Sequence, residues 1–274
     1  MRYSIRAGSP EKISTDCVAV VVWSKAVLSD EASIIDSAAS KCISKITRAG
    51  DLTGKLGETQ IIHNLPGVQA RRVLLIGGGE KKKLTAKNAA KLLRSSLIAA
   101  GKLQAEKLHF ALGSLAVTDR DTNWLAARLA QETEACSYRY DTTKSKKPKP
   151  VATKAVSLAP AASARRNSLQ AALKAGQVVG KAINRARQLG NLPSNICTPT
   201  FLAKQANTLA ERQRSITTKV LSEYQMARLG MGSLLSVSAG SAEPAKLIVM
   251  QHKGAKADSR PHVLVGKGIT FDTG

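Results

Sequence analysis

The sequence predicts a mixed α/β fold: an N-terminal α/β domain with a mostly parallel sheet and flanking helices, followed by an incomplete second α/β domain. Short β-branched runs alternate with longer stretches of helical periodicity, as parallel strands joined by crossover helices require. A long, alanine-rich, proline-free segment then separates the two parts. The 274 residues, 43% of them hydrophobic and 22% charged, are enough to bury the core of each part.

The first part is expected to contain five strands, each a short run rich in β-branched or aliphatic residues. The segment LLIGGGEKKKL places three glycines directly after the fourth run. It lacks the GxGxxG and GxxxxGK[ST] spacings, so a tight exit from the strand is favoured over a phosphate-binding loop. The five predicted strands are residues 3–6, 17–23, 59–63, 72–76 and 107–112.

Three helices are expected between these strands, over residues 30–47, 85–100 and 121–137. Each begins with an Asp or Thr that can cap the first turn. Residues 144–154, KSKKPKPVATK, combine like charges with two prolines, which excludes the interior of a helix. This segment is interpreted as an exposed crossing that ends in an edge strand.

The remainder begins with a long connecting helix over residues 164–189, where Leu169 and Leu173 share one face at helical spacing. A further helix is predicted at 198–213, since Thr198 can cap it and Pro199 occupies its first position. Three strands follow in the prediction, the last of them short, apolar and buried; they are residues 216–221, 247–251 and 262–265. The predicted boundaries are an N-terminal domain at 1–160, a connecting helix at 161–190 and the start of a second domain at 191–274.

Basic residues outnumber acidic ones by 42 to 19, which gives a formal net charge of +23. The excess is uneven, because residues 142–210 contain 12 Lys or Arg and no Asp or Glu. Polyanions are therefore candidate partners. Aromatic residues make up only 3%, too few to favour a stacking platform for single-stranded nucleic acid.

The cysteines and the N-terminus indicate a cytoplasmic protein. Cys17, Cys42, Cys136 and Cys197 have no zinc-ribbon, zinc-finger or thioredoxin spacing and are interpreted as reduced, mostly buried thiols. The N-terminal segment lacks the pattern of a signal peptide. No run of about 18 apolar residues is present, so we expect no membrane-spanning helix and no membrane partner.

The last residues, VLVGKGITFDTG, carry the candidate chemistry. The apolar run 263–265 would bring Lys267 to the carboxyl end of a strand, where open α/β sheets bind ligands. Lys267 and Asp272 are five positions apart, so in a continuous strand they would point to opposite faces. They can face one site only if the chain turns between them, which Gly266 and Gly268 permit. On spacing alone, such a turn is more often a solvated loop with a surface ion pair.

At this point the sequence resembles the leucyl aminopeptidase family, the cytosol aminopeptidases and bacterial aminopeptidase A type. GKGITFDTG is close to a family signature. The segments NLPSNICTPTFLAKQA, MGSLLSVSAGS and KLIVMQHKG match the start of the family's catalytic domain, and residues 50–77 are similar to the N-terminal domain of bacterial members. The resemblance covers nearly the whole chain.

The resemblance implies a two-metal aminopeptidase. In such enzymes the lysine matching Lys267 binds one divalent ion, and the aspartate matching Asp272 bridges both. An amine binds a metal only when neutral, and a carboxylate has one oxygen for each ion. Two ions, Mn or Zn, would polarise the terminal peptide carbonyl, bind the free α-amine and activate water for amide hydrolysis. The implied substrates are peptides with a free N-terminus, preferably leucine-like, and the family forms homohexamers through its catalytic domains.

The resemblance stops early in the catalytic domain, where family members continue with further carboxylates, a second lysine and an arginine. We therefore expect this chain to be truncated, to contain no catalytic residue, to hold two metals only weakly and to be inactive by itself. The loss of most of that domain also argues against the hexamer for this chain. Residues 191–274 are expected to be the less stable part, because the last strand would lack its sheet neighbours.

Two other functions stay open. A DNA-binding or regulatory protein could use the basic stretch 142–210, since some bacterial relatives bind DNA, although a merely solvated basic surface explains the same charge. The chain could also be an inactive structural relative. Other chemistries have little support, because the histidines form no HExxH pair and the serines no GxSxG elbow. The residues concerned are His63, His109, His252, His262, Ser194 and Ser241.

Overall fold

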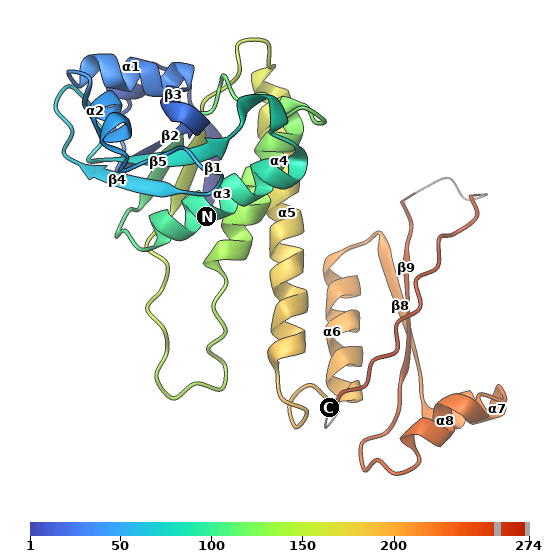
Figure 1. Cartoon of the computed structure of the whole chain (residues 1–274). Coiled ribbons are helices and arrows are strands. Elements are labelled where there is room, and N and C mark those ends of the chain that lie inside the picture. The colour runs from blue at the N-terminus through green and yellow to red at the C-terminus, as the bar shows by residue number, and fades with distance from the viewer. Residues whose placement is uncertain (255–258, 272–274) are drawn as a thin grey trace. The chain divides into compact units, whose positions relative to one another are not determined.

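The computed structural model describes residues 1–254 and 259–271 (Figure 1). The chain divides into two compact units, Met1–Arg187 and Gln188–Gly274, and each is described by itself. The predicted domain boundaries at 160 and 190 stay a prediction.

The first unit is built on a seven-stranded sheet that is mostly parallel, as predicted. Its strand order is β1-β7-β6-β2-β5-β4, and β3 pairs with β2 beside this path. All neighbouring pairs along the path are parallel except β4 with β5, and β3 is antiparallel to β2. The strands are β1 (Arg2–Ile5), β2 (Cys17–Trp23), β3 (Val27–Leu28), β4 (Thr59–His63), β5 (Arg72–Gly79), β6 (Lys107–Phe110) and β7 (Ala155–Leu158).

Two helices of the first unit, α3 and α4, begin at their predicted caps, whereas α1 is capped by Ser29 and not by the predicted Asp30. The side chains of Ser29, Thr85 and Asp121 accept a hydrogen bond from the backbone at the start of α1, α3 and α4, respectively. The helices are α1 (Asp30–Ala38), α2 (Cys42–Ala49), α3 (Ala86–Gly101), α4 (Thr122–Ser137) and α5 (Arg166–Asn191), with short 3₁₀ turns η1 (Pro10–Lys12), η2 (Ser24–Ala26) and η3 (Lys81–Lys83).

The single helix predicted over residues 30–47 is wrong, because the chain breaks between α1 and α2. Ser40 and Lys41 adopt positive φ angles of 52° and 61°, which no helix interior accommodates. The buried carboxylate of Asp36 accepts hydrogen bonds from the backbone N–H and the hydroxyl of Ser44, at 2.9 and 2.6 Å. This acid therefore satisfies donors in the first turn of α2, a tertiary device that periodicity does not reveal.

The sheet is covered on both faces, and β2 supplies side chains to both. Cys17, Ala19, Val21 and Trp23 belong to the apolar cluster that includes residues of α3, α4 and α5. The alternate residues Val18, Val20 and Val22 belong to a second cluster with residues of α1 and α2. An uninterrupted apolar run is the expected pattern for a parallel strand buried on both faces.

Two local predictions in the first unit are wrong. The strand after the basic segment 144–154 is not at an edge, because β7 pairs with β1 on one side and β6 on the other. The three glycines do not end their strand, since β5 includes them. A Cβ at Gly77 would lie 1.9 Å from the carbonyl oxygen of Lys55, so the missing side chain allows the loop to pack against the strand.

The described residues of the second unit form a β8–β9 antiparallel pair and three helices. Its buried apolar cluster is small and consists of Leu221, Met226 and Ala245. The predicted strand at 262–265 is wrong: these residues form no strand, and Leu264 is 98% exposed. An apolar run becomes a buried strand only when neighbours pair and cover it, and the described part of this unit supplies none there. The elements are α6 (Pro199–Arg212), β8 (Ile216–Leu221), α7 (Glu223–Arg228), α8 (Gly232–Ser238) and β9 (Leu247–His252).

Candidate metal site

Lys267 lies in the exposed segment that follows β9 and belongs to no helix or strand. Its flanking glycines lie in open space, where an added Cβ at Gly266 or Gly268 would meet nothing within 4 Å. Between Lys267 and Phe271 the structure has one bend, at Thr270. The lysine amine is therefore accessible to solvent, and the described residues do not fix it in place.

Asp272, the predicted partner of Lys267, lies outside the described residues. The pairing of these two side chains is therefore untested and stays a prediction. Among residues 1–254 and 259–271, no three His, Cys, Asp or Glu side chains come together as a metal site. The donors present in this range do not fit a two-metal centre by themselves, since a divalent pair requires several oxygen or nitrogen ligands.

The histidines occupy separate places. His109 is fully buried in β6, and its Nδ1 lies 2.9 Å from the hydroxyl oxygen of Ser157, whereas its Nε2 has no partner among the described residues. Burial, with a smaller effect of the Arg6 guanidinium, lowers the pKa of His109 to about 4. The other three, His63, His252 and His262, are exposed.

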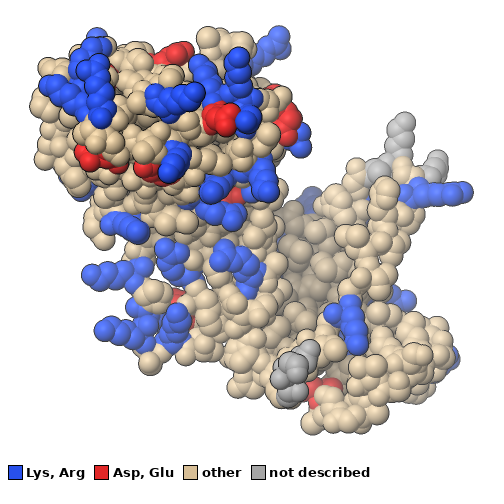
Figure 2. Space-filling model, in the orientation of Figure 1, with Lys and Arg blue, Asp and Glu red and all other residues tan. Residues whose placement is uncertain are grey.

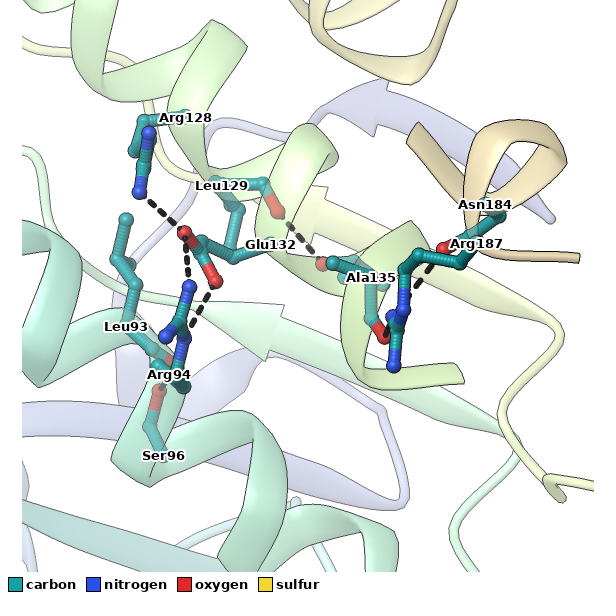
Figure 3. Close-up of polar contacts among 10 residues, drawn as sticks. Leu93, Arg94, Ser96, Arg128, Leu129, Glu132, Ala135, Asn184 and Arg187 are labelled. Carbon is teal, nitrogen blue, oxygen red and sulfur yellow. Dashed lines mark hydrogen bonds and ion pairs between the residues drawn. The ribbon is translucent and has the colours of Figure 1, made fainter. Parts of the chain in front are cut away.

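A polar cluster of the first unit surrounds Glu132, whose side chain is 2% exposed (Figure 3). Arg94 of α3 donates two hydrogen bonds to its carboxylate, at 2.9 and 3.2 Å, and Arg128 forms a second ion pair one helical turn away. These hydrogen bonds raise the pKa of Arg94. The cluster joins α3 to α4 and pairs the buried acid with two arginines, so its geometry indicates a structural role, although the buried Nε of Arg128 has no hydrogen-bond partner among the described residues. The i, i+4 spacing of Arg128 and Glu132 was the sequence signal for part of it.

Lys and Arg side chains are scattered over the visible face of the first unit and are more frequent there than acidic side chains (Figure 2). The connection between α4 and β7 is the most basic segment. Lys144, Lys146, Lys147 and Lys149 are all exposed, and no ion pair joins them to another described residue. These four lysines are called the arm lysines, and no acidic side chain of the described residues is paired with them. No helix in the described chain is long and apolar enough to span a bilayer.

Both parts of the chain are similar to known proteins. Residues 19–147 match the family description "Cytosol aminopeptidase family, N-terminal domain", and residues 184–274 match "Cytosol aminopeptidase family, catalytic domain". A probable cytosol aminopeptidase of Nitrosococcus oceani is 42% identical over 283 residues, and the cytosol aminopeptidase of Pseudomonas aeruginosa PAO1 is 40% identical over 275. Both alignments cover the whole chain and 55% of the relative, so the chain spans about half the length of these relatives.

Solved structures show the same fold. A mutant of tomato leucine aminopeptidase matches the whole chain with a TM-score of 0.84 at 21% identity, and 55% of that protein is covered. The bottromycin maturation enzyme BotP, in a complex with Mn, matches 85% of the chain with a TM-score of 0.62 at 23% identity, over 44% of its own length. At such identities the likeness concerns the fold.

Proposed function

We propose, from the premise that this chain belongs to the cytosol aminopeptidase family, that the complete protein is a leucyl aminopeptidase. It hydrolyses the first peptide bond of peptides with a free N-terminus and prefers leucine-like residues there. The observation that carries the proposal is the position of GKGITFDTG, which falls inside the stretch that matches the family's catalytic domain.

The proposed reaction depends on two divalent ions, Mn or Zn, with Lys267 and Asp272 among their ligands. The support is chemical: a neutral amine can donate its lone pair to a metal, and a carboxylate can bridge two ions. A relative in fold, BotP, has a structure in complex with Mn. The described residues alone do not make this centre, so the remaining ligands belong to the rest of the catalytic domain.

It follows that these 274 residues alone have negligible turnover. The test is release of the anilide from a leucine anilide with added Mn, measured for this chain and for a longer protein that includes the rest of the catalytic domain. We expect activity only in the longer protein. Robust turnover by the 274-residue chain would contradict the proposal that further ligands are needed.

Lys267→Gln in the longer protein tests the proposed ligand. Loss of one metal ligand is expected to lower turnover at least about tenfold and to weaken Mn binding. Lys253→Gln is the matched control, because Lys253 is also an exposed lysine of the second unit and lies outside the signature. Equal activity of the two variants would remove Lys267 from the site.

A DNA-binding role is a second candidate, and the unpaired arm lysines are the observation that favours it. If they contact duplex phosphates, each contributes about 0.9 to the slope of log affinity against log salt. Replacing all four by Gln should therefore reduce the slope by up to about 4. Lys81 and Lys82, which are also exposed, are the control, and replacing them by Gln should change the salt slope little. Absence of duplex binding at low salt would eliminate this role.

The assembly and location of the protein follow the same premise. We propose that the complete protein is cytoplasmic, as its relatives' names indicate, and forms a homohexamer through its catalytic domain. The 274-residue chain is expected to be a smaller species. Sedimentation of the two proteins measures this directly, and a hexamer of the short chain would contradict the expectation.

A further inference from the structure

A pocket of about 310 Å³ opens in the first unit, where the ends of α3 and α4 meet the starts of β6 and β7. Apolar side chains make up much of its lining, and it includes the C-terminal glycine of α3, Gly101. A volume near 300 Å³ is at the lower end of the range of small-molecule sites. The apolar residues that line it are Met1, Leu97, Ile98, Leu108, Cys136 and Val151.

The charged groups of this pocket all have one sign. Lys102 and Arg139 line it, and no Asp or Glu does. Lys102 forms no ion pair with any residue in the described ranges. Nη1 of Arg139 donates to the carbonyl oxygens of Cys136 and Tyr138, at 2.9 and 2.8 Å, which holds the guanidinium beside the pocket. Two cations therefore lie next to an apolar cavity without a neutralising carboxylate in its lining.

The hydroxyl groups that line the pocket are not available to donate a hydrogen bond to a ligand. Each of them donates its proton to a backbone carbonyl: Thr133 to Leu129 at 2.7 Å, Ser137 to Glu134 at 2.8 Å and Thr153 to Ala105 at 3.0 Å. The side-chain donors left for a ligand are thus those of Lys102 and Arg139.

We propose that this pocket binds a small monocarboxylate with an apolar body, its carboxylate between Lys102 and Arg139 and its chain among the apolar side chains. Charge-assisted hydrogen bonds to a carboxylate are the strongest that the two cations can make. A free amino acid does not fit, because its ammonium group would find no acidic partner in the lining. The site is therefore independent of the proposed peptidase activity and of its products.

Octanoate is the probe, and alkylation of Cys136 by N-ethylmaleimide is the measurement, with peptide mapping to separate the four cysteines. Cys136 and Cys42 are both half-buried, whereas Cys17 and Cys197 are buried, so Cys42 is an internal control outside the pocket. Burial and the nearby Glu132 raise the pKa of Cys136, so the reaction is run at mildly alkaline pH.

We expect octanoate at about ten times its Kd to slow alkylation of Cys136 about tenfold and to leave Cys42 unchanged. Octylammonium and octanol have the same chain without the negative charge and should protect much less. Lys102→Gln and Arg139→Gln should each weaken the protection. Lys87→Gln is the control, because Lys87 is an exposed lysine of α3 outside the pocket, and this variant should not weaken the protection. Equal protection by the three probes, protection of both cysteines, or no protection would overturn the proposal.

Gly101→Leu tests the location of the ligand without disturbing the fold. A Cβ at Gly101 meets nothing within 4 Å, and because Gly101 lines the pocket, we expect a leucine side chain there to take up part of the space that the ligand needs. Replacing a helical glycine also favours α3. We expect this variant to be at least as stable as the natural sequence and to lose the protection of Cys136 by octanoate. Full protection in a stable Gly101→Leu protein would place the ligand elsewhere and refute the proposal.

Discussion

Gly77 shows how a single residue determines whether a loop can pack on the sheet. Its α-hydrogen faces the carbonyl oxygen of Lys55, and a methyl group there would lie 1.9 Å from that oxygen. Since the contact is with backbone, no side-chain rotation can relieve it. The glycine run of β5 is thus explained by close packing, and a phosphate ligand is not needed to account for it.

Gly77→Ala should lower the free energy of unfolding by about 2 to 3 kcal/mol, because the loop or the strand must move apart. The matched control is Gly101→Ala, because a Cβ at Gly101 lies in open space. This variant should raise the free energy of unfolding by about 0.5 to 1 kcal/mol. Urea titrations followed by circular dichroism give both values. Equal stability of the two variants would show that the Lys55 contact is easily relaxed.

His109 makes the first unit sensitive to acid. Its pKa of about 4 lies below the ordinary value of 6.5, so the unfolded chain binds the proton more tightly than the folded one. The free energy of unfolding should therefore fall as the pH falls from about 6.5 towards 4, by up to about 1.4 kcal/mol per pH unit.

His109→Gln should remove this contribution, so its stability should decline less steeply over the same pH range. Urea titrations at a series of pH values measure the slopes. His63→Gln provides the comparison, because His63 is exposed and its replacement should leave the slope unchanged. An unchanged slope in His109→Gln would mean that other groups control acid unfolding.

At the scale of elements, α5 holds the C-terminal end of α4. Asn184 Nδ2 donates to the carbonyl oxygen of Glu134 at 2.8 Å. Arg187 Nη1 donates to the carbonyl oxygen of Ala135 at 3.0 Å (Figure 3). The Arg187 guanidinium also lies 4.3 Å from the centre of the Tyr138 ring. Two of the last carbonyls of α4, those of Glu134 and Ala135, therefore accept hydrogen bonds from side chains of a second helix.

Replacing both Asn184 and Arg187 by Ala should cost about 1 to 3 kcal/mol, since each hydrogen bond contributes about 0.5 to 1.5 kcal/mol. Faster hydrogen exchange at the end of α4 and in the last turns of α5 is the expected local result. Lys181→Ala, an exposed position of the same helix, is the control and should exchange like the natural sequence. Unchanged exchange in the double variant would mean that these contacts do not hold the helix ends.

Sequence periodicity predicted the elements that are set by local preference and failed where tertiary contacts decide. β2, β4 and β8 have the predicted bounds, and the helices capped by Thr85, Asp121 and Thr198 begin as expected. The break between α1 and α2 depends on the Asp36 carboxylate, and the interior position of β7 depends on pairing with β1, a segment about 150 residues earlier. Neither signal is local.

The candidate site was predictable only in part for the same reason. The signature around Lys267 is local and was identified from sequence, whereas the approach of Lys267 to Asp272 stays a prediction, because Asp272 lies outside the described residues. The pocket beside Cys136 combines residues from five separate segments, so no sequence window could contain it.

At the scale of the whole molecule, the two units differ in how much apolar surface they bury. The first has two extensive clusters on the two faces of its sheet, and the second has Leu221, Met226 and Ala245 with a few half-buried neighbours. Since buried apolar area is the main stabilising term, the second unit should be the weaker.

Urea should therefore unfold the chain in two steps, with amides of α6 to β9 exchanging before those of the central strands. Hydrogen exchange resolved by mass spectrometry assigns each step to its unit. Leu92→Ala, which removes a fully buried side chain from the first unit, should shift the later step alone. A single transition, with both units exchanging together, would contradict this prediction.

The position of β7 between β1 and β6 has a consequence for synthesis on the ribosome. Among the described residues β1 pairs only with β7, so during synthesis β1 has no partner until residue 158 has been made. At ordinary rates of translation this interval is roughly 10 to 30 seconds. During that time β1 is accessible to chaperones and to neighbouring chains on the same messenger RNA. Its exposure ends when the ribosome has passed the arm lysines and β7 has been made.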